Sequence, residues 1–118
     1  LTMTNITFRT HFGHIFQISA ENHTGYDQEG YDIVCSAVSA LMITTANGLV
    51  SVAEIPDVEI KTDAEIGYMF IGLPKTGMLP KDQFKSDLLL DTLEKGLMAI
   101  EEAYFENVEI QWIADDQE

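Results

Sequence analysis

The chemistry of this sequence centres on its single cysteine, Cys35, and on a histidine twelve residues before it, His23. Gly25 and Gly30 lie in the polar segment between them, and glycine allows the backbone angles that a tight loop requires. A cysteine thiolate is a strong nucleophile, and an imidazole can accept and return a proton. A Cys–His pair joined by such a loop therefore predicts the nucleophilic catalysis of a cysteine hydrolase.

The residues around Cys35 predict that the thiol lies near the start of a helix. Asp32 is a good N-cap residue, and a helix is expected from about Ile33 to Asn47, with Cys35 at its third position. N–H groups in a first turn lack partners within the helix, so they favour a thiolate and can hold a substrate oxyanion. Asp32 could instead orient His23 as a third catalytic member, and the sequence leaves both roles open.

A structural role for Cys35 is the main alternative, because a lone cysteine in an apolar helix is most often a small buried hydrophobe. Its combination with His23, the glycine loop and the helix start favours catalysis. A zinc site would need the three histidines, His11, His14 and His23, beside the thiol. His14 and His23 lie at opposite ends of one expected strand, about 25 Å apart at the usual rise per residue. We therefore expect no metal and no cofactor.

The periodicity of the apolar residues predicts one domain over residues 1–118, with elements in the order ββαββαβ. Strands are expected at residues 6–10, 15–22, 58–63, 66–73 and 108–112, and helices at 33–47 and 81–105. Gly48 fits the left-handed residue that ends a helix. Single helices between so few strands argue against a doubly wound parallel sheet. The fold class is therefore α+β, a two-layer, mainly antiparallel sheet with both helices on one face.

The charge of the chain limits its partners. Twenty acidic and six basic side chains give a net charge of -14, which repels nucleic-acid backbone and attracts a basic protein. A single cysteine cannot form an internal disulfide. The absence of internal disulfides is typical of proteins in a reducing cytoplasm. We find no secretory signal pattern and no unbroken apolar run of the roughly 18 residues that a membrane span needs. We expect a cytoplasmic protein that binds neither membrane nor nucleic acid directly.

The segment around Cys35 also resembles a known family. It combines His23-Thr-Gly25 at a strand end with Gly30-Tyr-Asp-Ile-Val-Cys35 at a helix start, followed by Ser36-Ala-Val-Ser39. This combination closely resembles the signature of the bacterial ribosomal-processing cysteine protease family, Prp. The family often has a glycine before its histidine or a small residue after it, whereas this chain has Asn22 and Thr24.

The resemblance implies a Cys–His protease with Cys35 as nucleophile and His23 as base and acid. It also implies a homodimer, which suits a first helix that is apolar almost all round. Its relatives remove a short N-terminal extension from a basic large-subunit ribosomal protein, the one numbered twenty-seven, and cut after an aromatic pair. Tyr26 and Tyr31 are candidates for recognising an aromatic side chain. The rival class is a non-catalytic acidic binding module for basic ribosomal proteins, in which the thiol has no role.

Overall fold

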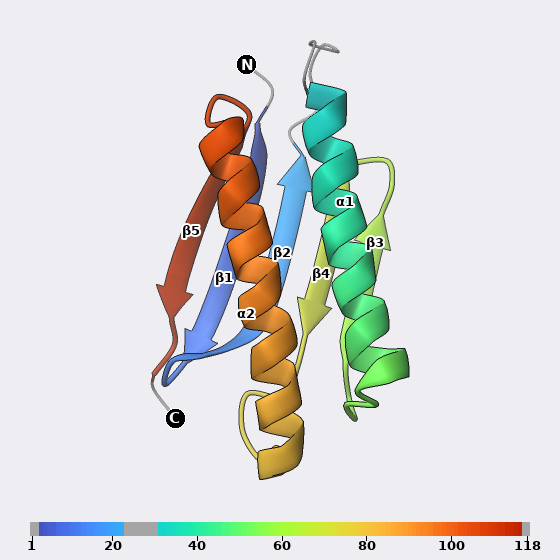
Figure 1. The fold of residues 1–118 in the computed structure, drawn as a ribbon, viewed down its shortest axis with the longest axis vertical. Helices are drawn as coiled ribbons and strands as arrows, with labels where there is room; N and C mark the ends of the chain where they lie inside the picture. Colours follow the sequence, from blue (N-terminus) through green and yellow to red (C-terminus); the bar gives the residue numbers. More distant parts are fainter. Residues whose placement is uncertain (1–2, 23–30, 117–118) are drawn as a thin grey trace.

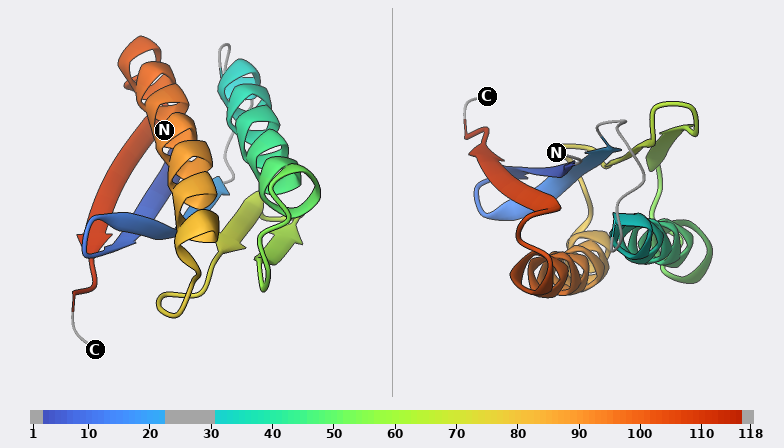
Figure 2. Two further views of the ribbon diagram at one scale, coloured as in Figure 1. Left: turned by 60° about the horizontal axis from the view of Figure 1, so that its bottom comes forward. Right: turned by 90° about the horizontal axis from the view of Figure 1, so that it is seen from above.

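The computed structural model describes residues 3–22 and 31–116 of the chain. Five strands form one sheet, and two helices lie side by side across it (Figure 1). Seen end on, both helices lie on the same side of the sheet (Figure 2). The predicted α+β class and the order ββαββαβ are therefore confirmed.

The sheet is mainly antiparallel, as the sequence predicts. Its strands are β1 (Thr4–His11), β2 (His14–Asn22), β3 (Glu59–Asp63), β4 (Tyr68–Gly72) and β5 (Val108–Ala114). They lie in the order β3-β4-β2-β1-β5, and only the β1–β5 pair is parallel. β1 and β2 are joined at Phe12 and Gly13, whose φ angles of 47° and 84° suit a tight hairpin turn.

The helices are α1 (Tyr31–Asn47), which continues into the π-helical turn η1 (Gly48–Val52), and α2 (Pro80–Ala103). The prediction that Gly48 ends the first helix in a left-handed conformation is wrong. The chain continues helically, and the Ala53 N–H donates a hydrogen bond of 2.8 Å to the Gly48 carbonyl oxygen. Packing explains the extension, because Gly48 lies against Leu89 of α2 and the next residue, Leu49, is fully buried.

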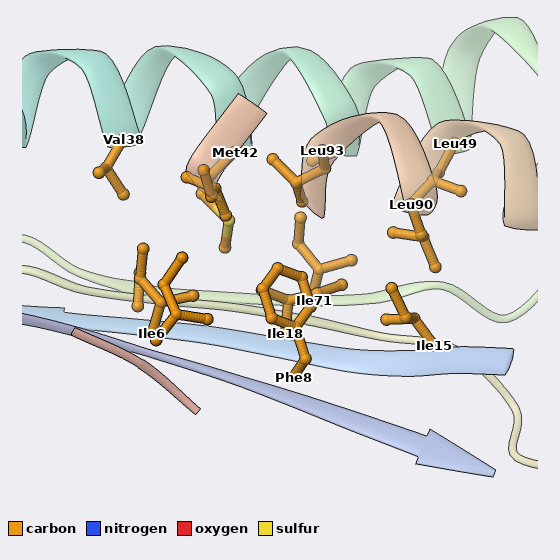
Figure 3. Close-up of a cluster of buried hydrophobic side chains, with 14 of the residues drawn as sticks. Ile6, Phe8, Ile15, Ile18, Val38, Met42, Leu49, Ile71, Leu90 and Leu93 are labelled. Atoms are coloured by element: carbon orange, nitrogen blue, oxygen red, sulfur yellow. The ribbon is translucent and has the colours of Figure 1, made fainter. Parts of the chain in front are cut away.

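The hydrophobic core fills the space between the sheet and the helices (Figure 3). β1 and β2 contribute every second residue, because successive side chains of a strand point to opposite faces. α2 contributes residues three or four apart, which share one face of a helix. The largest apolar side chains that are fully buried are Ile6, Phe8, Ile18, Val34, Met42, Leu49, Ile71, Leu90, Leu97 and Val108.

One face of α1 is exposed to solvent, and Ile33 and Ile43 are at least half exposed. The stretch Ile33–Val52 has a mean hydropathy of 1.8, and by length and composition alone it could cross a membrane. A third of the stretch is buried, and Val34 and Val38 face the core. A core helix of a globular domain passes the same test. The expectation that the protein has no membrane partner stays a prediction.

Acidic residues crowd one side of α2. Partial burial and then repulsion from Asp87 and Glu94 raise the pKa of Asp91 above its ordinary value of 3.8, while His14 and Lys95 act in the opposite direction. The folded chain therefore binds a proton at Asp91 more tightly than the unfolded chain does. The ionised carboxylate costs stability at neutral pH, and this cost disappears as the pH falls through the raised pKa to below 3.8.

Replacing Asp91 by asparagine is therefore expected to stabilise the protein at pH 7 by about 0.3 kcal/mol, a small value because solvent screens the site. Urea unfolding at pH 7 and at pH 3.5 measures the effect, and the gain should vanish at the lower pH. Glu102→Gln is the control, since it removes an equal charge from an exposed position of the same helix. A gain that is larger at pH 3.5 would contradict this account of Asp91.

Candidate active site

Cys35 lies on α1 and has a half-buried, free thiol. The helix begins at Tyr31, so Asp32 lies inside the first turn and is not the N-cap residue that the sequence predicts. Aspartate is also favourable within a first turn, because its charge complements the helix dipole, and this explains the misplaced boundary. Cys35 is accordingly the fifth helical residue rather than the third. By helix geometry, the N–H groups that lack an acceptor within α1 belong to the residues before Cys35 in the first turn.

The cysteine is the predicted site residue that the structure describes most fully. Tyr31 and Asp32 form part of α1, but their side chains lie outside the described part of the chain. Their roles in recognition and in orienting the histidine stay predictions. The remaining predicted site residues lie outside the described residues altogether: His23, Gly25, Tyr26 and Gly30.

The end of β2, from which the chain continues to His23, is held from two sides. The side-chain oxygen of Asn22 accepts a hydrogen bond of 2.7 Å from the hydroxyl of Thr4, which is fully buried in β1. The Asn22 N–H donates a bond of 3.2 Å to the carbonyl oxygen of Gly67, in the turn between β3 and β4. Asn22 therefore fixes the end of β2 within the sheet and against the β3–β4 turn. In the sequence, Asn22 stands out only because the family often has glycine at this position.

Gly67 meets Asn22 so closely that no side chain fits there. Its φ is +62°, and an added Cβ would lie 2.5 Å from the Asn22 Nδ2 atom. Gly67→Ala is therefore expected to destabilise the protein by about 2–3 kcal/mol, of which roughly 1 is the left-handed backbone and the rest the displaced Asn22 side chain. Urea unfolding measures this loss.

Gly77→Ala provides the matched control for this prediction. Gly77 also has a positive φ, +85°, but an added Cβ would meet nothing within 4 Å. Gly77→Ala should lower the free energy of unfolding by only about 1 kcal/mol, which is the cost of the left-handed backbone. Equal losses in the two variants would show that the contact between Gly67 and Asn22 contributes nothing.

A pocket of about 390 Å³ opens between α1 and the β3–β4 hairpin, beside the end of β2. Most of its lining is apolar: the residues are Ala20, Asn22, Val38, Ser39, Met42, Ile43, Thr62, Asp63, Ala64, Gly67, Tyr68 and Met69. Val38, Ser39 and Met42 follow Cys35 by three, four and seven residues, so they continue the helix face on which the thiol lies. The sequence could not reveal this pocket, since the hairpin wall is distant along the chain.

Within the described residues, the structure shows no cluster of three or more side chains suited to a metal ion. His11 is buried, and its Nδ1 atom hydrogen-bonds the carbonyl oxygen of Asp115. His14 pairs with Asp87 of α2, 2.9 Å from its carboxylate. These two histidines thus have separate structural partners near the turn between β1 and β2.

The fold is shared with solved structures. A protein from Streptococcus mutans is 28% identical, with a TM-score of 0.82 over 96% of each chain. The crystal structure of the ribosomal processing protease Prp from Staphylococcus aureus with a substrate peptide is 22% identical, with a TM-score of 0.79. That likeness covers 93% of this chain and 99% of the other. At 22% identity, the similarity to the Staphylococcus aureus structure is evidence for the shared fold alone.

Sequence comparison identifies the family. The ribosomal processing cysteine protease Prp of Staphylococcus aureus is 28% identical over 101 residues, which are 85% of this chain and 89% of the relative. The Bacillus subtilis protein of the same name is 26% identical over 103 residues, or 86% and 89%. The family model described as cysteine protease Prp matches residues 3–109. Because this match spans most of the chain and includes its only thiol, the chain belongs to the Prp family of cysteine proteases.

Proposed function

We propose that this protein removes a short N-terminal extension from the large-subunit ribosomal protein numbered twenty-seven. The observation that carries the proposal is the family match over residues 3–109, which spans the segment around Cys35. Two relatives are named ribosomal processing cysteine proteases, and one structural neighbour holds a substrate peptide. The net charge of -14 also suits a basic substrate, whose association should weaken as salt is added.

In the proposed reaction the Cys35 thiolate attacks the scissile carbonyl carbon and forms a tetrahedral intermediate. His23 then protonates the leaving amine, and the C–N bond breaks to give a thioester on Cys35. Water, deprotonated by His23, attacks the thioester and releases the carboxylate and the thiol. The unpartnered N–H groups in the first turn of α1 can stabilise the oxyanion. The reaction needs neither a metal nor a cofactor.

We also propose that the protein works in the cytoplasm as a homodimer, without direct contact to nucleic acid or membrane. Large apolar side chains are exposed along its helical layer, and the largest exposed fractions there are those of Val52, Phe84, Ile33 and Leu88. A second copy packed on this layer would remove apolar surface from water. Sedimentation of the wild-type protein and of Leu88→Asp tests the dimer, which the added charge should weaken.

The test of the protease uses the ribosomal protein numbered twenty-seven from the same organism, with its extension intact. The wild-type protein should cut it once, after the aromatic pair, and mass spectrometry identifies the new N-terminus. Cys35→Ala and His23→Ala should leave the substrate whole. Equal cleavage by all three proteins would end the proposal. Tight binding of the substrate without any cleavage by the wild-type protein would favour the acidic binding module instead.

A further inference from the structure

We propose that the hollow at the end of α2, lined by residues 103–107, binds an arginine or lysine side chain of the substrate a few residues after the cut. This inference rests on the proposed protease function, because it assigns a second recognition site to the same substrate. The proposed substrate is a basic protein that loses only a short extension. Its positive charge therefore lies mostly in the part that remains after cleavage, and this part is the expected occupant.

The packing of the two helices places the hollow near Cys35. The helices run in opposite directions, so the C-terminus of α2 lies at the same end of the molecule as the N-terminus of α1 (Figure 1). Gly96 of α2 lies against Leu41 of α1. Cys35 precedes Leu41 by six residues, and Glu102 follows Gly96 by six. Because both helices rise by about 1.5 Å per residue, Cys35 lies level with Glu102, and the hollow begins one residue beyond that level.

The sheet gives the same separation from the other side. Thr4 of β1 pairs with Asn22, the last residue of β2, and with Val108, the first residue of β5. The Thr4 N–H also donates a hydrogen bond of 2.8 Å to the carbonyl oxygen of Asn107, which lines the hollow. The end of β2 and the start of β5 are thus two strand spacings apart, about 10 Å.

These separations set the reach that a substrate needs. Packed helices lie about 8–10 Å apart, and the hollow extends a few residues past the level of the thiol. An extended peptide advances about 3.3 Å per residue. A peptide whose scissile carbonyl lies at Cys35 can therefore bring a side chain to the hollow about three to five residues from the cut.

The lining of the hollow suits a cation. Its volume is about 230 Å³, and it presents the rings of Tyr104 and Phe105, of which 36% and 71% are exposed. The face of an exposed aromatic ring attracts a guanidinium or ammonium group. Glu106 is an exposed lining residue, and no ion pair among the described residues involves it. The end of α2 adds the negative pole of its dipole.

The surroundings of the hollow favour a basic partner over an apolar one. Residues 96–116 include no lysine, arginine or histidine. Glu102 and Glu109 are exposed and add negative charge beside Glu106. Lys81 lies near the other end of α2, about 33 Å away along the helix axis. An apolar partner would leave these carboxylates without an opposite charge, whereas a basic segment would neutralise them.

The experiment measures peptide binding to the Cys35→Ala protein by fluorescence anisotropy, because cleavage cannot interfere there. Each probe has a Phe–Phe pair followed by neutral residues, with one arginine moved along the positions after the pair. The reference peptide has citrulline, an uncharged side chain of the same shape, in place of the arginine. At a position about three to five residues after the pair, arginine should bind about fivefold more tightly at low salt.

Variants of the hollow test where this preference arises. Adding Glu106→Gln removes the carboxylate, and adding Phe105→Leu removes the ring but keeps an apolar side chain. Each should reduce the preference for arginine to about twofold, and the two together should abolish it. The matched control is Glu54→Gln, which removes the same charge from an exposed residue after η1, at the other end of the molecule. It should leave the fivefold preference unchanged.

Three results would overturn the assignment of the hollow. They are equal binding of the arginine and citrulline peptides at every position, a preference that survives in the protein with both hollow substitutions, and an equal loss in Glu54→Gln. The last result would show that only the net charge of the protein attracts the arginine.

This design separates the hollow from the protease. If the hollow variants lose the preference while the wild-type protein cuts no substrate, the assignment of the hollow holds and the proposed function fails. If the wild-type protein cuts its substrate but shows no preference that depends on Glu106 and Phe105, the proposed function holds and the assignment of the hollow fails.

Discussion

Replacing Cys35 by alanine is expected to lower kcat/KM for removal of the extension by about 10³-fold or more, as loss of a catalytic nucleophile does in other hydrolases. In the proposed reaction the Cys35 thiol supplies the atom that forms the covalent intermediate, and the sequence has no second cysteine that could replace it. Cys35→Ser should be almost as inactive, because a hydroxyl is a much weaker nucleophile at neutral pH. Initial rates measured by mass spectrometry over a range of substrate concentrations give kcat and KM separately.

Ser36→Ala is the control for this loss, since Ser36 is the next residue along α1 and is exposed. It should retain activity within about twofold, as a surface change away from the reacting atoms does. Thermal unfolding should show that Cys35→Ala is folded, so that its inactivity reflects chemistry. Retained cleavage in a folded Cys35→Ala protein would show that the thiol is not the nucleophile.

Truncating Phe8 to alanine is expected to cost about 3–5 kcal/mol of the free energy of unfolding. Phe8 has no exposed surface, lies on β1 between two neighbouring strands, and stacks on Trp112 with ring centroids 5.9 Å apart. A domain of this size has only about 5–15 kcal/mol of stability. Urea unfolding followed by tryptophan fluorescence reports the change, because Trp112 is the only tryptophan of the chain.

Phe105→Ala is the matched comparison, because 71% of Phe105 is exposed in the turn between α2 and β5. The same truncation there should cost less than about 0.5 kcal/mol, as exposed substitutions do. Similar losses at Phe8 and Phe105 would contradict the description of the core.

Local patterns in the sequence were sufficient to predict much of this fold. The alternation in residues 6–10 and 15–22 reflects a sheet with one buried face, and β1 and β2 follow it closely. The helix expected at 81–105 is α2, and its buried Leu90, Leu93 and Leu97 show the spacing of an amphipathic helix. The family was likewise recognisable from the short segment around Cys35.

Features that depend on distant parts of the chain could not be predicted in this way. The pocket joins α1 to a hairpin, and Asn22 meets Gly67, which lies in a different part of the sequence. Whether a final strand pairs with β1 or with β3 depends on which sheet edge the finished fold leaves open. Even the local start of α1 was misplaced, because aspartate suits both a cap and a first turn.

The parallel pairing of β1 with β5 affects how the protein can fold during its synthesis. Thr7 and Gln111, which hydrogen-bond across this pair, are separated by 104 positions. At about 5–20 residues added per second, β1 is synthesised about 5–20 s before β5. During this time one edge of β1 lacks its hydrogen-bonding partner. The sheet can therefore be completed only after β5 has been translated.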